Sequence, residues 1–237
     1  WRSAVQIRPP QPIQMIKNPI YSKFHSEFFD KIIIKKRFEI VKIINDVIVS
    51  NNIKDVLDVG TTKDNVNASS NLIAKNLKNI KNLYSISDQK IEFPYFKKKL
   101  QKSIVEYFSP NEIDEFKTDL VISNATIEHV GSKNNQKKMI ENMMKFSRKL
   151  VVIITPNRFY PIDFHTKIPF IHWFPKKFHR KILKMINLPF YSKEENLNLL
   201  SKNDVLDLIN LNEIKCEFKY IKLMFFKSNL IFIATKN

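Results

Sequence analysis

Glycine and cysteine are the residues that this chain of 237 amino acids uses least. Its single cysteine, Cys216, excludes an internal disulfide framework and a zinc site built from cysteines. No uninterrupted apolar run reaches the ~18–20 residues that a membrane-spanning helix needs, and the N-terminal residues lack the apolar core of a signal peptide. These absences predict a cytoplasmic location. The hydrophobic fraction of 43% is sufficient for one large core.

Arginine is also scarce, although the formal net charge is +17. Such a charge invites a nucleic-acid interpretation. Nearly all of the positive residues are lysines, however, and arginine occurs at only six positions. Because arginine binds phosphates and bases in a bidentate manner and lysine acts as a point charge, the composition favours a solvated lysine surface and argues against a nucleic-acid partner.

Residues 1–14 contain three prolines and no periodic pattern. Nothing in them can join a core, so we expect an extension that is disordered or not native, with Met15 as the natural start. Residues 15–237 are expected to form a single domain.

Helix-like and strand-like patterns alternate along that domain. Apolar periodicity predicts helices over residues 22–50, 67–77, 137–146 and 205–210, the last opened by a capping box at Ser201 and Asp204. Apolar runs predict strands over residues 53–59, 83–87, 103–107, 119–123 and 150–155. Two further strand-like runs, 215–225 and 229–235, predict a hairpin joined by residues 226–229. The pattern indicates an α/β fold: a Rossmann-like, doubly wound, mostly parallel seven-stranded sheet with a C-terminal antiparallel hairpin.

The segment 56–64, V-L-D-V-G-T-T-K-D, places Gly60, one of only two glycines, directly after a predicted buried strand. Glycine permits positive φ and a close approach of the backbone to a ligand. A helix that begins after such a turn would aim free N–H groups at a carboxylate or phosphate. An ordinary strand-to-helix turn is the alternative, because one glycine is a weaker signal than a glycine-rich motif.

Three more stretches extend this signal: D-L-V-I-S-N-A-T-I-E-H-V-G-S at 119–132, L-V-V-I-I-T-P-N-R at 150–158, and the final hairpin. In this order they resemble the class I S-adenosylmethionine-dependent methyltransferases, in particular the type-eleven or ubiquinone-biosynthesis-like domains. The resemblance implies S-adenosylmethionine as the cofactor, bound at the carboxyl ends of the strands. It implies contacts from the first loop, from an acid after the second strand and from the end of the fourth strand: Asp58, Val59, Gly60, Thr61, Asp88, Ser123 and Asn124.

Catalytic candidates follow from the same resemblance and from the chemistry of histidine. Methyl transfer to oxygen or nitrogen benefits from a general base that titrates near neutrality. His129, in I-E-H-V, and His165, past the fifth strand, are the candidates, and Glu128 could orient a histidine or bind a metal. Either histidine could instead be structural. Asp163 is separated from His165 by one residue, which argues against contact, and the sequence assigns no set of metal ligands.

Residues 157–191 form an aromatic, proline-rich and basic insertion. Its length suggests a lid or acceptor-binding segment that packs over cofactor and acceptor. A membrane-surface segment over 159–184, with Phe170, Trp173, Phe174 and Phe178 inserted, is a second interpretation. Packing on the sheet with solvated charges is a third.

The sequence therefore predicts an enzyme that methylates a small-molecule, lipid-linked or glycan-precursor acceptor. One departure from the family supports an alternative. Thr61, Thr62 and Lys63 stand where the family usually has further glycines, and β-branched residues resist positive φ. The alternative is a catalytically decayed methyltransferase fold that acts as a basic module for binding RNA or a partner.

Overall fold

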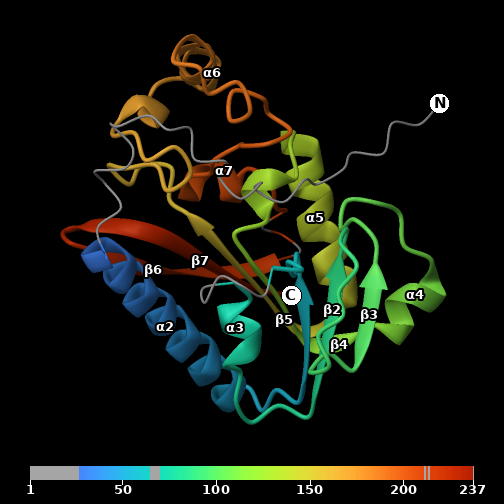
Figure 1. Cartoon of the computed structure of the whole chain (residues 1–237). Coiled ribbons are helices and arrows are strands. Elements are labelled where there is room, and N and C mark those ends of the chain that lie inside the picture. The colour runs from blue at the N-terminus through green and yellow to red at the C-terminus, as the bar shows by residue number, and fades with distance from the viewer. Residues whose placement is uncertain (1–26, 65–69, 211, 213, 237) are drawn as a thin grey trace.

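A computed structural model gives the fold and describes residues 27–64, 70–210, 212 and 214–236 (Figure 1). One seven-stranded sheet has the order β3-β2-β1-β4-β5-β7-β6. The first five strands are parallel, and β7 runs antiparallel to both β5 and β6, as predicted. The strands are β1 (Asp55–Val59), β2 (Asn82–Ser87), β3 (Lys98–Gln101), β4 (Thr118–Asn124), β5 (Ser147–Pro156), β6 (Ile214–Leu223) and β7 (Phe226–Lys236).

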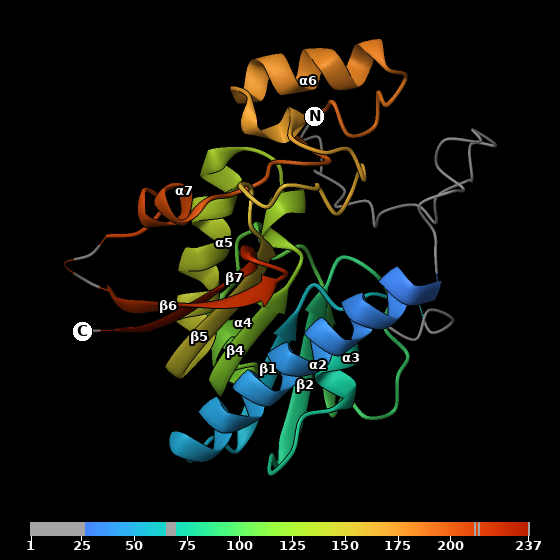
Figure 2. The same cartoon turned by 90° about the vertical axis from the view of Figure 1, so that its left-hand side faces the viewer.

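Helices cover both faces of the sheet (Figures 1 and 2). Helices α2 (Glu27–Ser50) and α3 (Leu72–Lys75) pack on one face, and α4 (Pro110–Glu115), α5 (Lys133–Phe146) and α7 (Lys202–Leu206) lie on the other. Successive side chains of β5 show why both layers form: Val152 joins the α2 core, whereas Val151 and Ile153 join the α5 core. A strand buried on both faces has a continuous apolar sequence, as this one does.

The insertion lies outside these two layers. Helix α6 (Lys176–Met185) and the short η2 (Ile171–Trp173) lie beyond the end of the sheet toward which the parallel strands point (Figures 1 and 2). The four aromatic side chains proposed for a membrane surface are 40–52% exposed: Phe170, Trp173, Phe174 and Phe178. Membrane contact through 159–184 stays a prediction. In the part of the chain described, no helix is both long and apolar enough to cross a bilayer.

Two predictions of strand and turn position are wrong. Residues 103–107 form a turn in which the Ser103 backbone N–H donates to the Glu106 carboxylate, and the third parallel strand is β3 instead. Because β3 is an edge strand paired only with β2, its sequence, K-K-L-Q, has no apolar run to reveal it. The hairpin turns at Met224 and Phe225, before residues 226–229, which already belong to β7.

The helix predictions were closer. Helix α5 begins four residues earlier than expected because the Ser132 side chain caps it by accepting from Asn135 N–H. The capping box of Ser201 and Asp204 opens α7, as predicted, but the helix spans Lys202–Leu206, so most of the predicted range 205–210 is not helical. Of the helix predicted over 67–77, the described part contains only α3. The expectations for residues 1–14, and for the start of the helix at 22–26, lie outside the described residues.

Candidate functional site

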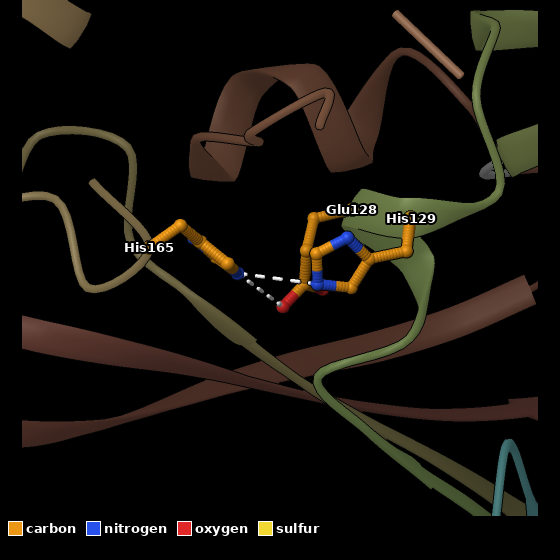
Figure 3. Close-up of side chains that lie close together, drawn as sticks. All are labelled: Glu128, His129 and His165. Atoms are coloured by element: carbon orange, nitrogen blue, oxygen red, sulfur yellow. Dashed lines mark hydrogen bonds and ion pairs between the residues drawn. The ribbon is translucent and has the colours of Figure 1, made fainter. Parts of the chain in front are cut away.

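Glu128, His129 and His165 meet beyond the carboxyl ends of β4 and β5 (Figure 3). The first two belong to η1 (Ile127–His129), which follows β4, and the third lies in the loop after β5. The Nε2 atoms of the two histidines are 3.2 Å apart, and His165 Nε2 is 3.9 Å from Glu128 Oε1. We call these three side chains the histidine–glutamate cluster. Thus the three catalytic candidates from the sequence lie together.

Hydrogen bonds with neighbouring residues position His129 and Glu128. His129 Nδ1 lies 2.7 Å from the Asn196 carbonyl oxygen. Glu128 Oε2 accepts from the Thr155 hydroxyl at 2.9 Å, whereas Glu128 Oε1 is buried and has no hydrogen-bond partner. An unpartnered buried carboxylate oxygen is costly, so this atom indicates that the cluster is built to receive something.

Asp163 orients His165, contrary to the sequence expectation. His165 Nδ1 lies 3.1 Å from Asp163 Oδ1, and the backbone N–H groups of His165 and Thr166 also donate to this carboxylate. The aspartate closes a local turn on its own chain, which folds the following side chain back toward it. Spacing alone could not predict this turn.

The acceptors fix the tautomers of both rings. A carbonyl and a carboxylate only accept, so Nδ1 of His129 and Nδ1 of His165 each carry the donated proton. Two Nε2 lone pairs and one carboxylate oxygen would then face one another. Such an arrangement requires either one further proton or a cation between them.

The pKa shifts show where that proton resides. Burial lowers the pKa of His129 to about 3, and the charge of His165 adds to this effect. Burial alone would also lower the pKa of His165, but the hydrogen bond and charge of Asp163, aided by the charge of Glu128, raise it. Burial raises the pKa of Glu128. The further proton therefore goes to His165 more readily than to His129.

A divalent cation fits the same place. Two imidazole nitrogens and one carboxylate oxygen form a ligand set that suits Mn²⁺, Fe²⁺, Co²⁺, Ni²⁺ or Zn²⁺ better than Mg²⁺, which prefers oxygen. Nitrogens 3.2 Å apart have the spacing of neighbouring ligands around an ion with bonds of ~2.1 Å. Outer-sphere acceptors on both Nδ1 atoms are also what metal-binding histidines require. His165 is too far from Glu128 and His129 in the sequence for the three ligands to be recognised there as one set.

Asp58 lies at the end of β1, at the same edge of the sheet. It is 7% exposed and accepts from the Thr61 hydroxyl at 2.7 Å, and Thr61 in turn accepts from Ser85. Burial raises the pKa of Asp58 to about 6, and in the described part of the chain no lysine or arginine forms an ion pair with it. A cationic group on a ligand would compensate this buried charge.

Gly60 adopts a φ of +88°, which favours glycine. A Cβ at this position would lie 2.1 Å from Thr126 Oγ1, so the close approach is to Thr126. Its N–H donates to Ile86 O, and the N–H groups of Thr62 and Lys63 donate to side chains of Asn71 and Gln89. In the described residues of this loop, the N–H groups of Gly60, Thr62 and Lys63 are therefore already bonded within the fold, in contrast to the free N–H groups that the sequence suggested.

The remaining predicted contacts divide into two groups. Asp88 follows β2 and is half-buried, which raises its pKa, and Asn124 is exposed at the end of β4. Because β2, β1 and β4 are neighbours, Asp88, Asp58 and Asn124 share one edge of the sheet. Val59 and Ser123 are buried instead, and the Ser123 hydroxyl donates to Val59 O at 2.9 Å. These two residues support the edge from within.

Several solved structures with a similar fold are methyltransferases. The chain is similar to magnesium protoporphyrin IX methyltransferase ChlM from Synechocystis PCC 6803 with bound SAM, with 11% identity, a TM-score of 0.51 and coverage of 90% of this chain and 85% of that one. It is similar to N-methyltransferase NodS from Bradyrhizobium japonicum WM9 in complex with S-adenosyl-L-homocysteine, with 9% identity, a TM-score of 0.50 and coverage of 98% and 94%. The small RNA methyltransferase HEN1 matches with 14% identity, a TM-score of 0.53 and coverage of 85% of this chain and 25% of that one.

The chain has the class I S-adenosylmethionine-dependent methyltransferase fold. No protein-family profile and no curated protein sequence matches it. Three residues near the site, Tyr95, Thr155 and Asn196, were not predicted from the sequence. Burial and, to a smaller extent, the charge of Asp58 raise the pKa of Tyr95 to about 12, so this phenol lies within electrostatic reach of Asp58. The aromatic cluster of F-P-Y-F at 93–96 was its only signal.

Proposed function

We propose that this protein is an enzyme that transfers the methyl group of S-adenosylmethionine to an oxygen or nitrogen acceptor, assisted by a divalent cation at the histidine–glutamate cluster. One observation carries the proposal. Two Nε2 lone pairs and an unpartnered buried carboxylate oxygen converge at the edge of a methyltransferase sheet where ligands bind.

The residues at the ends of β1 and β2 fit the cofactor in part. S-adenosylmethionine supplies a methyl group already activated on sulfonium, so positioning accounts for much of the catalysis. Asp58 would bind its amino group, which explains a carboxylate buried without a cation, and Asp88 would accept from the ribose hydroxyls. Because N–H groups of the Gly60 loop already donate within the fold, fewer of them are available to bind the cofactor.

The cluster residues have separate roles at the acceptor. A bound divalent cation supplies Lewis acidity, which lowers the pKa of an acceptor hydroxyl. Glu128 contributes the negative charge of the site, and Asp163 and the Asn196 carbonyl keep both Nε2 atoms pointed at it. His129, whose pKa is about 3, stays neutral and available as a ligand.

The acceptor class is not selected by the fold. The similar structures include enzymes named for magnesium protoporphyrin IX and for small RNA. A small-molecule, lipid-linked or glycan-precursor acceptor remains our prediction for this chain, because its positive charge comes mainly from lysine.

A decayed, nonenzymatic binding module is the second candidate. The observation that favours it is Thr126, which occupies the space next to Gly60, together with the internally bonded loop. Titration calorimetry with S-adenosylmethionine separates the two candidates, since a decayed fold would give no binding heat.

Metal binding tests the proposed assistance directly. Mn²⁺ titrated into the full chain, and followed by electron paramagnetic resonance, should bind in the wild type. Glu128→Gln should weaken binding by at least about tenfold, because it removes the only anionic ligand. Glu141→Gln, at an exposed position on α5, removes the same charge elsewhere and should leave binding unchanged. Equal binding by both variants would contradict the assignment.

A further inference from the structure

A second polar pocket lies between η2, α6 and the segment 197–199. Arg158, His172, Lys176, His179 and Arg180 line it. Its volume is about 10 Å³, which is room for one oxygen-sized atom. We call it the basic pocket, since none of its lining residues is acidic.

Both imidazoles of the basic pocket have a ring nitrogen without a hydrogen-bond partner. His172 is 1% exposed and His179 is 8% exposed, and the unpartnered atoms are His172 Nδ1 and His179 Nε2. The other nitrogen of His172 lies 2.7 Å from Tyr160 O and donates to it. Two buried, unpartnered nitrogens in one pocket mark a place for a hydrogen-bonding ligand.

The charge around these nitrogens selects the ligand. Arg158 donates to the His172 and Phe174 carbonyls, and no carboxylate is paired with it in the described part of the chain. Lys176 lies 3.7 Å from Asp204, and Arg180 lies 3.1 Å from Glu194. Three cations therefore lie near two carboxylates, and the third carboxylate nearby, Asp163, is paired with His165. Residues 164–193 contain seven lysines and arginines but no aspartate or glutamate. The surplus charge favours an anion over a water molecule.

The basic pocket and the histidine–glutamate cluster share one stretch of chain. The Asn196 carbonyl accepts from His129, and the Asn198 backbone N–H donates to Glu128 O. Toward the basic pocket, the side-chain oxygen of Asn198 accepts from Lys176 Nζ at 2.9 Å. Asp163, which orients His165, also acts electrostatically on His172 and His179. Residues 196–198 thus contact both sites.

We propose that the basic pocket binds one oxygen of a phosphoryl group, and that this group belongs to a soluble, phosphorylated acceptor. The second half of the proposal rests on the proposed function, whereas the phosphate binding itself does not. Arg158, Lys176 and Arg180 supply the positive charge. His179 Nε2 is available as a donor, whereas His172 Nδ1 donates only when the phosphoryl group draws a second proton onto that ring, because its Nε2 proton goes to Tyr160 O. The phosphoryl group would hold the acceptor while its reactive atom reaches the cluster.

Inorganic phosphate is the first probe, titrated into the full chain without cofactor or metal and followed by calorimetry. Lys176→Met should weaken binding by about tenfold or more, the usual loss for a charged hydrogen bond. Lys177→Met removes the same charge from the neighbouring residue, which does not line the pocket, and should change binding less than about twofold. Circular dichroism checks that both variants fold, and Arg180→Met replaces Lys176→Met if that variant does not.

A second measurement reads the imidazoles directly. Phosphate should raise the pKa values of His172 and His179, which burial lowers in its absence, and NMR of the histidine ring protons follows this. Absence of phosphate binding by the wild type, or equal losses in the two lysine variants, would overturn the proposal.

Two further probes identify the source of the phosphoryl group. Glycerol phosphate should compete with inorganic phosphate, and phosphatidylglycerol vesicles should not. Binding to the vesicles alone, unaffected by Lys176→Met, would overturn the pocket and support the membrane interpretation of residues 159–184. Because none of these titrations involves methyl transfer, the pocket and the proposed function can fail separately.

Discussion

His129 and His165 face each other through their Nε2 atoms at 3.2 Å, while each ring donates its Nδ1 proton to a different acceptor. This pairing is stable only with a positive charge between the rings. The chain provides Asp163 behind one ring and Glu128 beside both, so the surroundings favour a positive charge there, whether a proton or a metal cation. The same geometry therefore connects metal binding, protonation and stability.

Metal affinity should rise with pH. The raised pKa of His165 means that a cation must displace its second proton, and this displacement becomes easier as pH rises through that pKa. Calorimetry with Mn²⁺ from about pH 6 to about pH 8 should show increasing affinity and proton release. A pH-independent affinity would show that the ion binds elsewhere.

Asp163→Asn should destabilise the protein near neutrality, by roughly 1–3 kcal/mol, since His165 and Thr166 would lose a charged acceptor. The pKa of Asp163 is lowered in the fold, so its contribution is present above its unfolded pKa and is lost as pH falls through the folded one. The pKa of His165 is raised, so its contribution is present below about pH 6.5 and is lost as pH rises through the folded value. The free energy of unfolding of the metal-free protein, measured with urea across these pH values, should depend less on pH in the variant than in the wild type. An unchanged pH dependence would contradict the pairing.

Asp58→Asn should make the protein more stable and weaken its cofactor binding. The pKa of Asp58 is about 6 in the folded protein in place of 3.8, so ionisation of Asp58 opposes folding. This cost grows as pH rises from the pKa of the unfolded state to that of the folded state. Removing the charge should stabilise the fold at pH 7 by up to ~3 kcal/mol. S-adenosylmethionine affinity should fall by about tenfold or more, because its amino group loses a charged acceptor.

Asp119→Asn serves as the comparison for Asp58→Asn. Asp119 is also mostly buried, but it is paired with Arg148, and its pKa is lowered. Its loss should destabilise the fold and leave cofactor affinity unchanged. If both variants lose stability equally, Asp58 is an ordinary structural carboxylate.

The sheet was predictable because its central strands are apolar on both faces. Residues of β5 and β4 form continuous apolar runs, and a strand of that kind fits only between two helical layers. The edge strand β3 lacked this signal because only one of its edges is paired. Apolar runs therefore predict the central strands that lie between two helical layers, and they are weaker in strands at the edge of the sheet.

The cluster was predictable only as separate residues. The E-H pair after β4 was visible, and so was His165, but α5 and β5 separate them, and the segment after β5 that contains His165 has no periodicity. Their meeting depends on the turn at Asp163 and on the Asn196 carbonyl, which reaches His129 from 67 residues away. The basic pocket depends on the same kind of long-range contact, between α6 and Asn198.

Gly60→Ala should destabilise the fold itself, before any effect on the cofactor. The new Cβ would meet Thr126 Oγ1 at 2.1 Å and Thr126 Cγ2 at 2.7 Å, and the residue would also keep a φ of +88°. We expect a loss of roughly 2–4 kcal/mol in the free energy of unfolding, measured with urea, from strain and overpacking together.

Gly131→Ala separates the two effects, because the φ of Gly131 is +91° but the nearest atom to a Cβ there lies 3.4 Å away. It should lose only the ~1–2 kcal/mol of backbone strain. Adding Thr126→Ala to Gly60→Ala should recover at least ~1 kcal/mol in a double-mutant cycle. Equal losses at the two glycines, with no recovery in the double variant, would show that Thr126 does not limit the loop and that Gly60 is kept for its backbone conformation alone.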